Sequence, residues 1–280
     1  MTDSVHKVLQ HYGVEGRIEP LGNGHIHDTF SVTSDAEAIK VLQRVNEFVF
    51  KDGDLVMNQT RRVLTRWAQQ DEFIVPALIK TSDGYDSVRV DGELWRMWKY
   101  LPDTQVIDPL RDPNQVYLAA RAFACFQKSM RDLGGPGLHD TIAGFLDYSH
   151  YLEAYTAVRG LAPQKLDQLI QTAAAMSEAL SERNAVIHGD CKVNNVLFDQ
   201  AGTRVVALID FDTVMHGHWS WDYGDLVRSV CFSAGGYSPE LYAACVRGFV
   251  GSLGGGLRGK TSDDEALVDA PAFLSVMLGM

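Results

Sequence analysis

Four polar residues between positions 188 and 210 have the types and spacing for chemistry on phosphate groups. His188, Asp190 and Asn195 fit the pattern H-x-D-x-x-x-x-N, and Asp210 follows an apolar run further along the chain. Phosphoryl transfer needs one carboxylate facing the attacking hydroxyl group, while an Asn and a second Asp hold metal against the nucleotide phosphates. Oxygen ligands of this kind suit Mg²⁺, which keeps its other positions for water and substrate phosphates. The four residues therefore predict a kinase-type site.

A predicted β-hairpin brings these side chains together. Two short apolar runs, Val196–Phe198 and Val205–Ile209, flank a glycine-containing turn, which is a hairpin signal. Antiparallel pairing would put Asn195 and Asp210 at the same open end, and an apolar pair upstream leads Asp190 into the loop that enters the hairpin. The competing interpretation is a polar loop before a surface hairpin with an acidic tip. The position of the hairpin and the trailing Asp favour the kinase-type site.

The residues around this hairpin resemble those of small-molecule kinases. HGDCKVNN followed by ALIDFD is similar to the aminoglycoside phosphotransferase and choline kinase superfamily. More narrowly, the chain resembles bacterial N-acetylhexosamine 1-kinases, and the likeness extends over IEPLGNGHIHDTFSVT, VLQRVN, WRMWKYL and DTVMHGHWSWDYGDLVR. The superfamily match is specific, whereas the match to the sugar kinases rests on similarity along the whole chain. The resemblance implies Asp190 as catalytic base, with Asn195 and Asp210 as metal ligands.

The predicted fold class is α+β, with the two lobes of a protein-kinase-like fold. Residues 1–101 are expected to form a small antiparallel β lobe that binds nucleotide, and residues 102–280 a mainly helical lobe for catalysis and acceptor binding. Helices are predicted over Ser4–Tyr12, Asp54–Gln69, Pro113–Met130, Phe145–Val158 and Gln164–Leu180. Strands are predicted over Arg17–Leu21, Thr29–Thr33, Ala38–Val45, Phe73–Lys80, Tyr85–Val90 and Leu94–Leu101.

The first lobe is expected to bind ATP. A turn with Gly22, Gly24 and His25 resembles an ordinary hairpin turn by itself, but at the head of a kinase-like chain it is expected to approach phosphates. The third strand offers two basic residues for the phosphates, Lys40 and Arg44, which share a strand face. Similarity to choline kinases favours Arg44.

Two features of this lobe depend on the resemblance. It assigns Trp98, Lys99 and Tyr100 to the connection between the lobes, where the backbone reads adenine, although a plain aromatic core strand fits the letters equally well. The family pattern also expects a Glu on the helix over Asp54–Gln69, to pair with Arg44. This helix contains none, so the partner of Arg44 is left open.

Further residues flank the predicted site. By resemblance, Asp222 braces the catalytic loop, with helix N-capping as an alternative or additional role. His188 is expected to be a structural hydrogen-bonding residue rather than a proton-transfer catalyst. Asp212 and Arg228 are candidates for acceptor contacts because they flank the site.

Other chemistries are less well supported. Cys191 lies in the catalytic loop, but the resemblance gives its position no nucleophilic role. The histidines near the site lack zinc-ligand spacing. The stretch Gly254–Thr261 fits the phosphate-loop pattern GxxxxGK[ST], yet a helical pattern precedes it and only 19 residues follow, which favours a linker between helices.

The composition predicts a cytoplasmic protein that binds neither nucleic acid nor membrane. A net charge of −11 over 280 residues opposes nucleic-acid binding, which needs a basic face. No apolar run reaches the ~20 residues of a membrane helix. The N-terminus lacks the features of a signal peptide, and the four cysteines show no disulfide spacing. Because related sugar kinases continue beyond the helix predicted over Asp264–Met280, a truncated C-terminus is expected.

Together these features predict ATP- and Mg²⁺-dependent phosphorylation of a small molecule. The resemblance implies the anomeric hydroxyl group of an amino sugar, N-acetylglucosamine or N-acetylgalactosamine, as the acceptor. Two alternatives stay open: a kinase of the same superfamily for choline, homoserine or an aminoglycoside, and a nucleotide-binding pseudokinase. The oligomeric state is not predicted.

Overall fold

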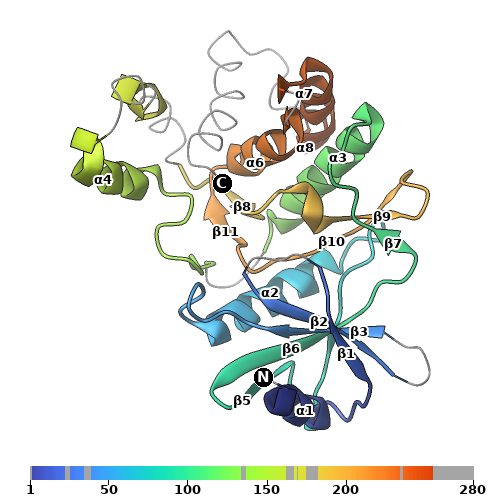
Figure 1. Ribbon diagram of the computed structural model, residues 1–280. Coiled ribbons are helices and arrows are strands. Elements are labelled where there is room, and N and C mark those ends of the chain that lie inside the picture. Colours follow the sequence, from blue (N-terminus) through green and yellow to red (C-terminus); the bar gives the residue numbers. More distant parts are fainter. Residues whose placement is uncertain are drawn as a thin grey trace. The chain divides into compact units, whose positions relative to one another are not determined.

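An antiparallel sheet dominates the N-terminal part of the computed structural model (Figure 1). The structure describes residues 2–22, 26–34, 39–133, 137–161, 167–168, 170–174, 182–233 and 236–254. The chain divides into two compact units. Unit 1 comprises Met1–Thr65 and Val75–Asp103, and unit 2 comprises Arg66–Ile74 and Thr104–Met280. Unit 1 holds the large sheet, and unit 2 holds most of the described helices.

Unit 1 is built on six strands that pair antiparallel. The strand order is β1-β2-β3-β6-β4, and β5 also pairs with β6. The strands are β1 (Arg17–Pro20), β2 (Asp28–Thr33), β3 (Ile39–Arg44), β4 (Leu78–Ile79), β5 (Ser87–Val90) and β6 (Glu93–Lys99).

Helices of unit 1 pack on this sheet, and they define the two faces of β3. Helix α1 (Thr2–His11) packs on a core that includes Leu42 of β3. Helix α2 (Gly53–Trp67) packs against Val45, just past the end of the strand. Because side chains alternate along a strand, Arg44 lies on the same face as Leu42, opposite to Val45.

Unit 2 combines three small sheets with helices. The sheets have the orders β10-β9-β7, β11-β8 and β12-β13. Their strands are β7 (Thr104–Gln105), β8 (Ala185–Ile187), β9 (Val196–Asp199), β10 (Val205–Leu208), β11 (Met215–Gly217), β12 (Phe232–Ser233) and β13 (Gly236–Tyr237). The helices are α3 (Pro113–Met130), α4 (Tyr148–Val158), η1 (Arg159–Leu161), η2 (Val193–Asn195), α6 (Ser220–Cys231), α7 (Pro239–Cys245), η3 (Val246–Val250) and α8 (Gly251–Leu253).

Helix α3 supplies much of the core of unit 2. Asp112 caps it by accepting a hydrogen bond from the backbone N–H of Asn114, and Pro113 begins the helix without needing a donor. The predicted apolar stripe is buried, and it consists of Val116, Ala119, Ala120, Phe123, Phe126 and Met130. The prediction of a core helix here is confirmed, and α3 packs against α7 and η3.

One predicted strand, Phe73–Lys80, is wrong over most of its length. Only Leu78–Ile79 forms a strand, since Pro76 has no N–H to give to a ladder. Before that proline, the ring of Phe73 stacks on Trp67 with the centroids 5.5 Å apart. Residues 66–74 belong to unit 2 because Trp67 packs edge-on against Phe126 of α3 and the backbone N–H of Ile74 donates to the carbonyl oxygen of Val206 at 2.8 Å.

Other predicted elements differ at their ends or lie outside the described residues. The helix predicted over Phe145–Val158 begins at Tyr148, because Asp147 caps it there. The helix predicted over Gln164–Leu180 is described only in part, and that over Asp264–Met280 lies outside the described residues. In the part of the chain that the structure describes, every helix is too short or too polar to cross a membrane.

Candidate active site

The loop over residues 188–195 follows β8 and is held by a carboxylate of α6. Asp222 accepts hydrogen bonds from the backbone N–H groups of His188, at 2.8 Å, and Gly189, at 2.9 Å. Gly189 has a φ of +81°, and a Cβ atom here would lie 2.6 Å from the carbonyl oxygen of Thr213. Only glycine fits this close approach, so the chain turns sharply just before Asp190.

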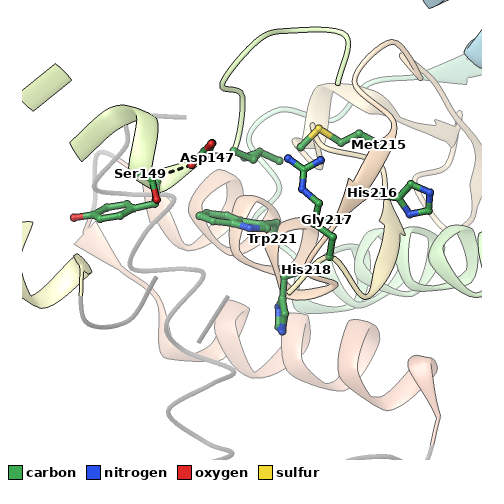
Figure 2. Close-up of a pocket in the computed structure, with 10 residues that line it drawn as sticks. Asp147, Ser149, Met215, His216, Gly217, His218 and Trp221 are labelled. Carbon is green, nitrogen blue, oxygen red and sulfur yellow. Dashed lines mark hydrogen bonds between the residues drawn. The ribbon is translucent and has the colours of Figure 1, made fainter. Parts of the chain in front are cut away.

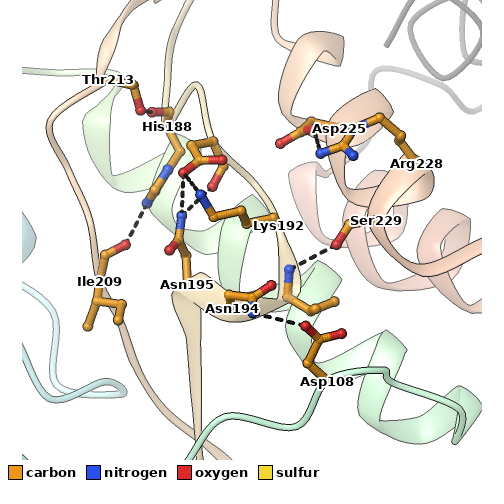
Figure 3. A network of polar contacts seen from close by, with 12 residues as sticks. Asp108, His188, Lys192, Asn194, Asn195, Ile209, Thr213, Asp225, Arg228 and Ser229 are labelled. Atoms are coloured by element: carbon orange, nitrogen blue, oxygen red, sulfur yellow. Dashed lines mark hydrogen bonds and ion pairs between the residues drawn. The ribbon is translucent and has the colours of Figure 1, made fainter. Parts of the chain in front are cut away.

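Asp190 is oriented by two donors from its own loop. Its Oδ2 accepts hydrogen bonds from Nζ of Lys192, at 2.6 Å, and from Nδ2 of Asn195, at 2.8 Å (Figure 3). Burial lowers the pKa of the Lys192 ammonium group, but the charge and hydrogen bond of Asp190, together with the charges of Asp210 and Asp225, outweigh burial and raise the pKa above its ordinary value. Among the described residues, Oδ1 of Asp190 has no hydrogen-bond partner. One oxygen of Asp190 is thus available to accept a proton from an incoming group.

Asn195 and Asp210 lie at the same end of the β9–β10 hairpin. The backbone N–H of Ile209 donates to the carbonyl oxygen of Asn195 at 3.0 Å, and β9 and β10 pair antiparallel. The predicted hairpin is therefore confirmed. Asp210 has a φ of +67°, a left-handed conformation that is uncommon for a residue with a Cβ atom and that clusters at functional sites.

The oxygen atoms at this end of the hairpin fit a hard divalent cation. Nδ2 of Asn195 is engaged with Asp190, so the amide oxygen of Asn195 faces another direction. Carboxylate oxygens of Asp210 and Asp212 lie within 4.8 Å of each other. Mg²⁺ binds carboxylate and amide oxygens of this kind. Asp212, which the sequence predicts as an acceptor contact, is thus placed beside the predicted metal ligand Asp210.

His188 is buried, and its ring contacts the hydrophobic core. Its Nε2 lies 3.2 Å from the carbonyl oxygen of Ile209, the residue that follows β10. Three rings surround the imidazole with centroids 5.3 to 5.4 Å away: those of Phe123, Phe126 and Phe211. This position lets His188 tie the 188–195 loop to the hairpin.

One face of helix α6 contacts the 188–195 loop along its length. Besides Asp222, Ser229 contacts the loop and accepts a hydrogen bond from the backbone N–H of Val193 at 3.0 Å. Between Asp222 and Ser229 lies Asp225, whose Oδ1 accepts hydrogen bonds from Arg228 (Figure 3). Residues three and four apart share one helix face, so these three α6 side chains face the loop together.

The motif does not identify Asp225, Lys192 or Ser229 as site residues. Asp225 is almost fully buried, and burial raises its pKa to about 7, with the charge of Asp190 adding to this effect and Arg228 opposing it. The only sequence signal is the helical spacing of Asp225 and Ser229 from Asp222, and it becomes informative only once the face of α6 is known.

In unit 1, Arg44 is paired with acids from neighbouring strands. Its Nε donates to Oδ2 of Asp28 at 2.7 Å, and its Nη1 lies 3.7 Å from Oε1 of Glu93. These two acids provide the partners that α2 does not supply. A cavity of about 570 Å³ adjoins Arg44 and is also lined by Asn46 and Glu47.

The glycine-bearing turn is described only in part. Gly22 has a φ of +75°, and a Cβ atom there would meet nothing within 4 Å. Gly24 and His25 lie outside the described residues. On β6, Nε1 of Trp98 donates to Oε1 of Gln43 at 2.8 Å.

The strand predicted over Leu94–Leu101 ends at Lys99. The backbone N–H of Lys99 donates to the carbonyl oxygen of Ala77 at 2.8 Å, and Lys99 lies opposite Lys40 in the sheet. Tyr100 is exposed. The predicted site residues thus fall into two groups, one around Asp190 in unit 2 and one on the sheet of unit 1.

A separate pocket of about 180 Å³ lies beside β11 in unit 2 (Figure 2). Its lining includes Asp147 and Ser149 at the start of α4, His216 and His218 around the end of β11, and Trp221 of α6. Among the described residues, its lining contains none from the 188–195 loop. By its described lining, this pocket is distinct from the surroundings of Asp190.

Comparison with known proteins gives the class. Over residues 17–256 the sequence matches the Phosphotransferase enzyme family (APH), and the chain belongs to this family. The coarse activity that the loop predicts, phosphoryl transfer, agrees with this assignment.

Solved kinases have similar folds. A microcompartment-associated aminopropanol kinase superposes with a TM-score of 0.76 at 18% identity, over 99% of this chain and 88% of that one. An amicoumacin kinase solved with AMP-PNP, Ca²⁺ and its ligand gives 0.70 at 14% identity, over 99% and 84%. A choline/ethanolamine kinase family protein from Mesorhizobium loti gives 0.61 at 18% identity, over 99% and 83%. The predicted protein-kinase-like α+β fold is confirmed.

Proposed function

We propose that this phosphotransferase transfers the γ-phosphoryl group of ATP to a hydroxyl group of a small molecule, with Mg²⁺ as the metal. The observation that carries the proposal is the hydrogen bonding of the Asp190 carboxylate. Lys192 and Asn195 fix one carboxylate oxygen of Asp190, and its other oxygen is open. In this role Asp190 orients the acceptor hydroxyl group and takes its proton as the oxygen attacks phosphorus.

Asn195 and Asp210 are the proposed metal ligands, and Asp212 is a further candidate. Bound Mg²⁺ would neutralise charge on the nucleotide phosphates. The support for this assignment is the chemistry of the donors: an amide oxygen directed away from Asp190 and two neighbouring carboxylates. His188 and Asp222 would hold the loop without touching substrate, since their polar contacts are with the backbone of unit 2 and, for Asp222, also with the side-chain amide of Gln127.

The proposed nucleotide site lies in the N-terminal lobe, residues 1–101. The turn with Gly22, Gly24 and His25 would approach the phosphates through its backbone N–H groups. The segment from Trp98 to Tyr100 would lie against adenine. The proposal requires that the guanidinium group of Arg44 bind phosphate while it stays paired with at least one of the acids Asp28 and Glu93.

The proposed acceptor is an N-acetylhexosamine, phosphorylated on its anomeric hydroxyl group. Sequence similarity to N-acetylhexosamine 1-kinases supports this choice, with Arg228 and Asp212 as candidate contacts in the lobe of residues 102–280. The second candidate is an amino-alcohol acceptor. Structural similarity to an aminopropanol kinase and to a choline/ethanolamine kinase family protein favours that alternative.

The test is ADP release by the 280-residue chain with ATP and Mg²⁺ across a panel of acceptors. The panel contains N-acetylglucosamine, N-acetylgalactosamine, choline, aminopropanol, homoserine and kanamycin. The expected result is release with an N-acetylhexosamine, and a ³¹P resonance of a sugar 1-phosphate in the product. Release only with another acceptor would keep the kinase and remove the sugar. Nucleotide binding without release in any sample would favour a pseudokinase.

A further inference from the structure

We propose that Asp225 and Arg228 form the acceptor-recognition pair of this site, and that the pair selects neutral, polyhydroxylated acceptors over acceptors that carry an ammonium group. The inference rests on the proposed function, in which Asp190 faces the acceptor hydroxyl group. It goes beyond the candidate contact at Arg228 by assigning Asp225 and by giving a physical basis for the choice of acceptor class.

The position of Asp225 follows from the contacts on either side of it along α6. Asp222 binds the backbone at the start of the 188–195 loop, and Ser229 binds the backbone N–H of Val193 further along it. Asp225 lies between them on the same helix face, and therefore opposite the middle of the loop. The charges of Asp190 and Lys192 act on Asp225 directly, which agrees with this placement.

The geometry of the pair leaves hydrogen-bonding groups for a ligand. Nε and Nη2 of Arg228 both donate to the same oxygen, Oδ1 of Asp225, at 2.9 and 2.7 Å. Among the described residues, neither Oδ2 of Asp225 nor Nη1 of Arg228 has a hydrogen-bond partner. The side chain of Arg228 is 27% exposed, so the pair is partly accessible. One accepting oxygen next to one charged donor is complementary to two neighbouring hydroxyl groups.

Burial of the Asp225 carboxylate costs free energy, and a role in ligand binding would account for that cost. Only 7% of the Asp225 side chain is exposed, and its pKa rises to about 7 despite the neighbouring guanidinium group. Replacing buried ion pairs by apolar residues is often neutral or stabilising, so a buried pair is weak evidence for a role in stability. Perturbed carboxyl groups cluster instead at functional sites.

The charges around the loop disfavour a cationic acceptor. The Asp190 carboxylate is already paired with the ammonium group of Lys192, and that of Asp225 with the guanidinium group of Arg228. Asp222 is occupied by two backbone N–H groups and by the side-chain amide of Gln127. An ammonium group entering beside these carboxylates would have to compete with the two cations already paired to them. A neutral acceptor with several hydroxyl groups avoids this repulsion and uses both the donor and the acceptor.

The test compares Asp225→Asn and Arg228→Lys with the unchanged chain in steady-state kinetics. The acceptors are N-acetylglucosamine, N-acetylgalactosamine, choline and aminopropanol, and the KM for ATP is measured in parallel. Both variants are expected to raise the KM for the sugar by about tenfold or more, because a site built around substrate hydrogen bonds rejects mismatched partners. The KM for ATP is expected to stay within about twofold, since uniform acceptor binding is lost without an effect on nucleotide.

The matched control is Arg121→Lys, which changes another ion pair of unit 2, that between Arg121 of α3 and Glu72. It is expected to leave all four KM values unchanged. Equal kcat losses with every acceptor would show that the pair only positions the loop, and would overturn the inference. The inference would also be overturned if the variants kept the KM of the unchanged chain for the sugars. A preference of the unchanged chain for choline or aminopropanol would overturn it as well. If the unchanged chain releases no ADP with any acceptor, the proposed function itself fails.

Arg228→Lys keeps the positive charge, and it provides a second test of the pair if Asp225→Asn fails to fold. Thermal unfolding of both variants identifies such a defect, and the kinetics of the folded variant then decide the question. A sugar-specific rise in KM in that variant supports the pair as the recognition element.

Discussion

The 188–195 loop of unit 2 and the basic end of β3 in unit 1 hold their predicted site residues in different ways. The loop is fixed by hydrogen bonds from its own backbone to buried side chains, chiefly Asp222. Arg44 on β3 is held by ion pairs with Asp28 and Glu93, and about a third of its side chain is exposed, at 33%.

The difference has an energetic consequence. A buried polar network is strengthened by the low local dielectric, and an unpaired group within it is costly. An exposed ion pair contributes only about 0 to 1 kcal/mol, and a ligand can replace one of its partners. We infer that Asp190 is preorganised for proton acceptance, whereas Arg44 is free to exchange partners when a nucleotide binds.

Asp222→Ala is expected to have the largest effect on stability. It leaves the N–H groups of His188 and Gly189 without their acceptor, and each unsatisfied buried donor costs about 1–3 kcal/mol. We expect urea unfolding to show a loss of about 3–5 kcal/mol. Ser229→Ala removes a single acceptor from the same loop and should cost about 1 kcal/mol. Equal losses in the two variants would contradict a central role for Asp222.

Asp225→Asn is expected to change how stability depends on pH. The pKa of Asp225 is raised to about 7 by burial, with Arg228 opposing and the charges of Asp190 and Asp222 adding to the rise, while Lys192 lowers it. The unfolded carboxyl group loses its proton first, near pH 4, so this group lowers the stability of the unchanged chain progressively from about pH 4 to about pH 7.

The Asn variant lacks this decline. Its Tm relative to the unchanged chain should therefore rise between about pH 4 and about pH 7 and level off above that range. Asp199→Asn is the control, because a hydrogen bond from the Thr203 backbone lowers the pKa of Asp199 and moves its titration below this range. A Tm difference that is flat with pH for Asp225→Asn would refute the burial effect.

Arg44→Ala is expected to have the smallest effect on stability, below about 1 kcal/mol, because its ion pairs are partly exposed. If Arg44 contacts phosphate, the KM for ATP should nevertheless rise by about tenfold. Arg61→Ala is the matched control, since Arg61 pairs with Asp86 of the same unit at 2.7 Å and neither residue lines the cavity beside Arg44. A similar KM for ATP in both variants would remove Arg44 from the nucleotide site.

The sequence predicts the hairpin and its acids because the signals are local. Two short apolar runs, a glycine-containing turn and the spacing of Asn195 and Asp210 all lie within one short stretch. Helix α3 was equally predictable, since Asp112, Pro113 and the apolar period mark its start and its buried face.

Features that depend on contacts distant in sequence were not predictable. The partners of Arg44 come from β2 and β6, and their register is set by the sheet as a whole. Asp225 gains its environment only when α6 packs along the 188–195 loop. The strand expected over Phe73–Lys80 is confined to Leu78–Ile79, because the segment before Pro76 makes its contacts with Phe126 and Val206 of unit 2, which are distant in sequence.

The most direct test of the central claim is a comparison of Asp190→Asn with the unchanged chain. ADP release is measured with ATP, Mg²⁺ and the best acceptor of the panel, and ATP affinity is measured by calorimetry. We predict a loss of turnover of about 10²- to 10⁴-fold, the usual contribution of a general base, with ATP affinity unchanged within about threefold. Turnover within about twofold of the unchanged chain would contradict the assignment of Asp190 as the base.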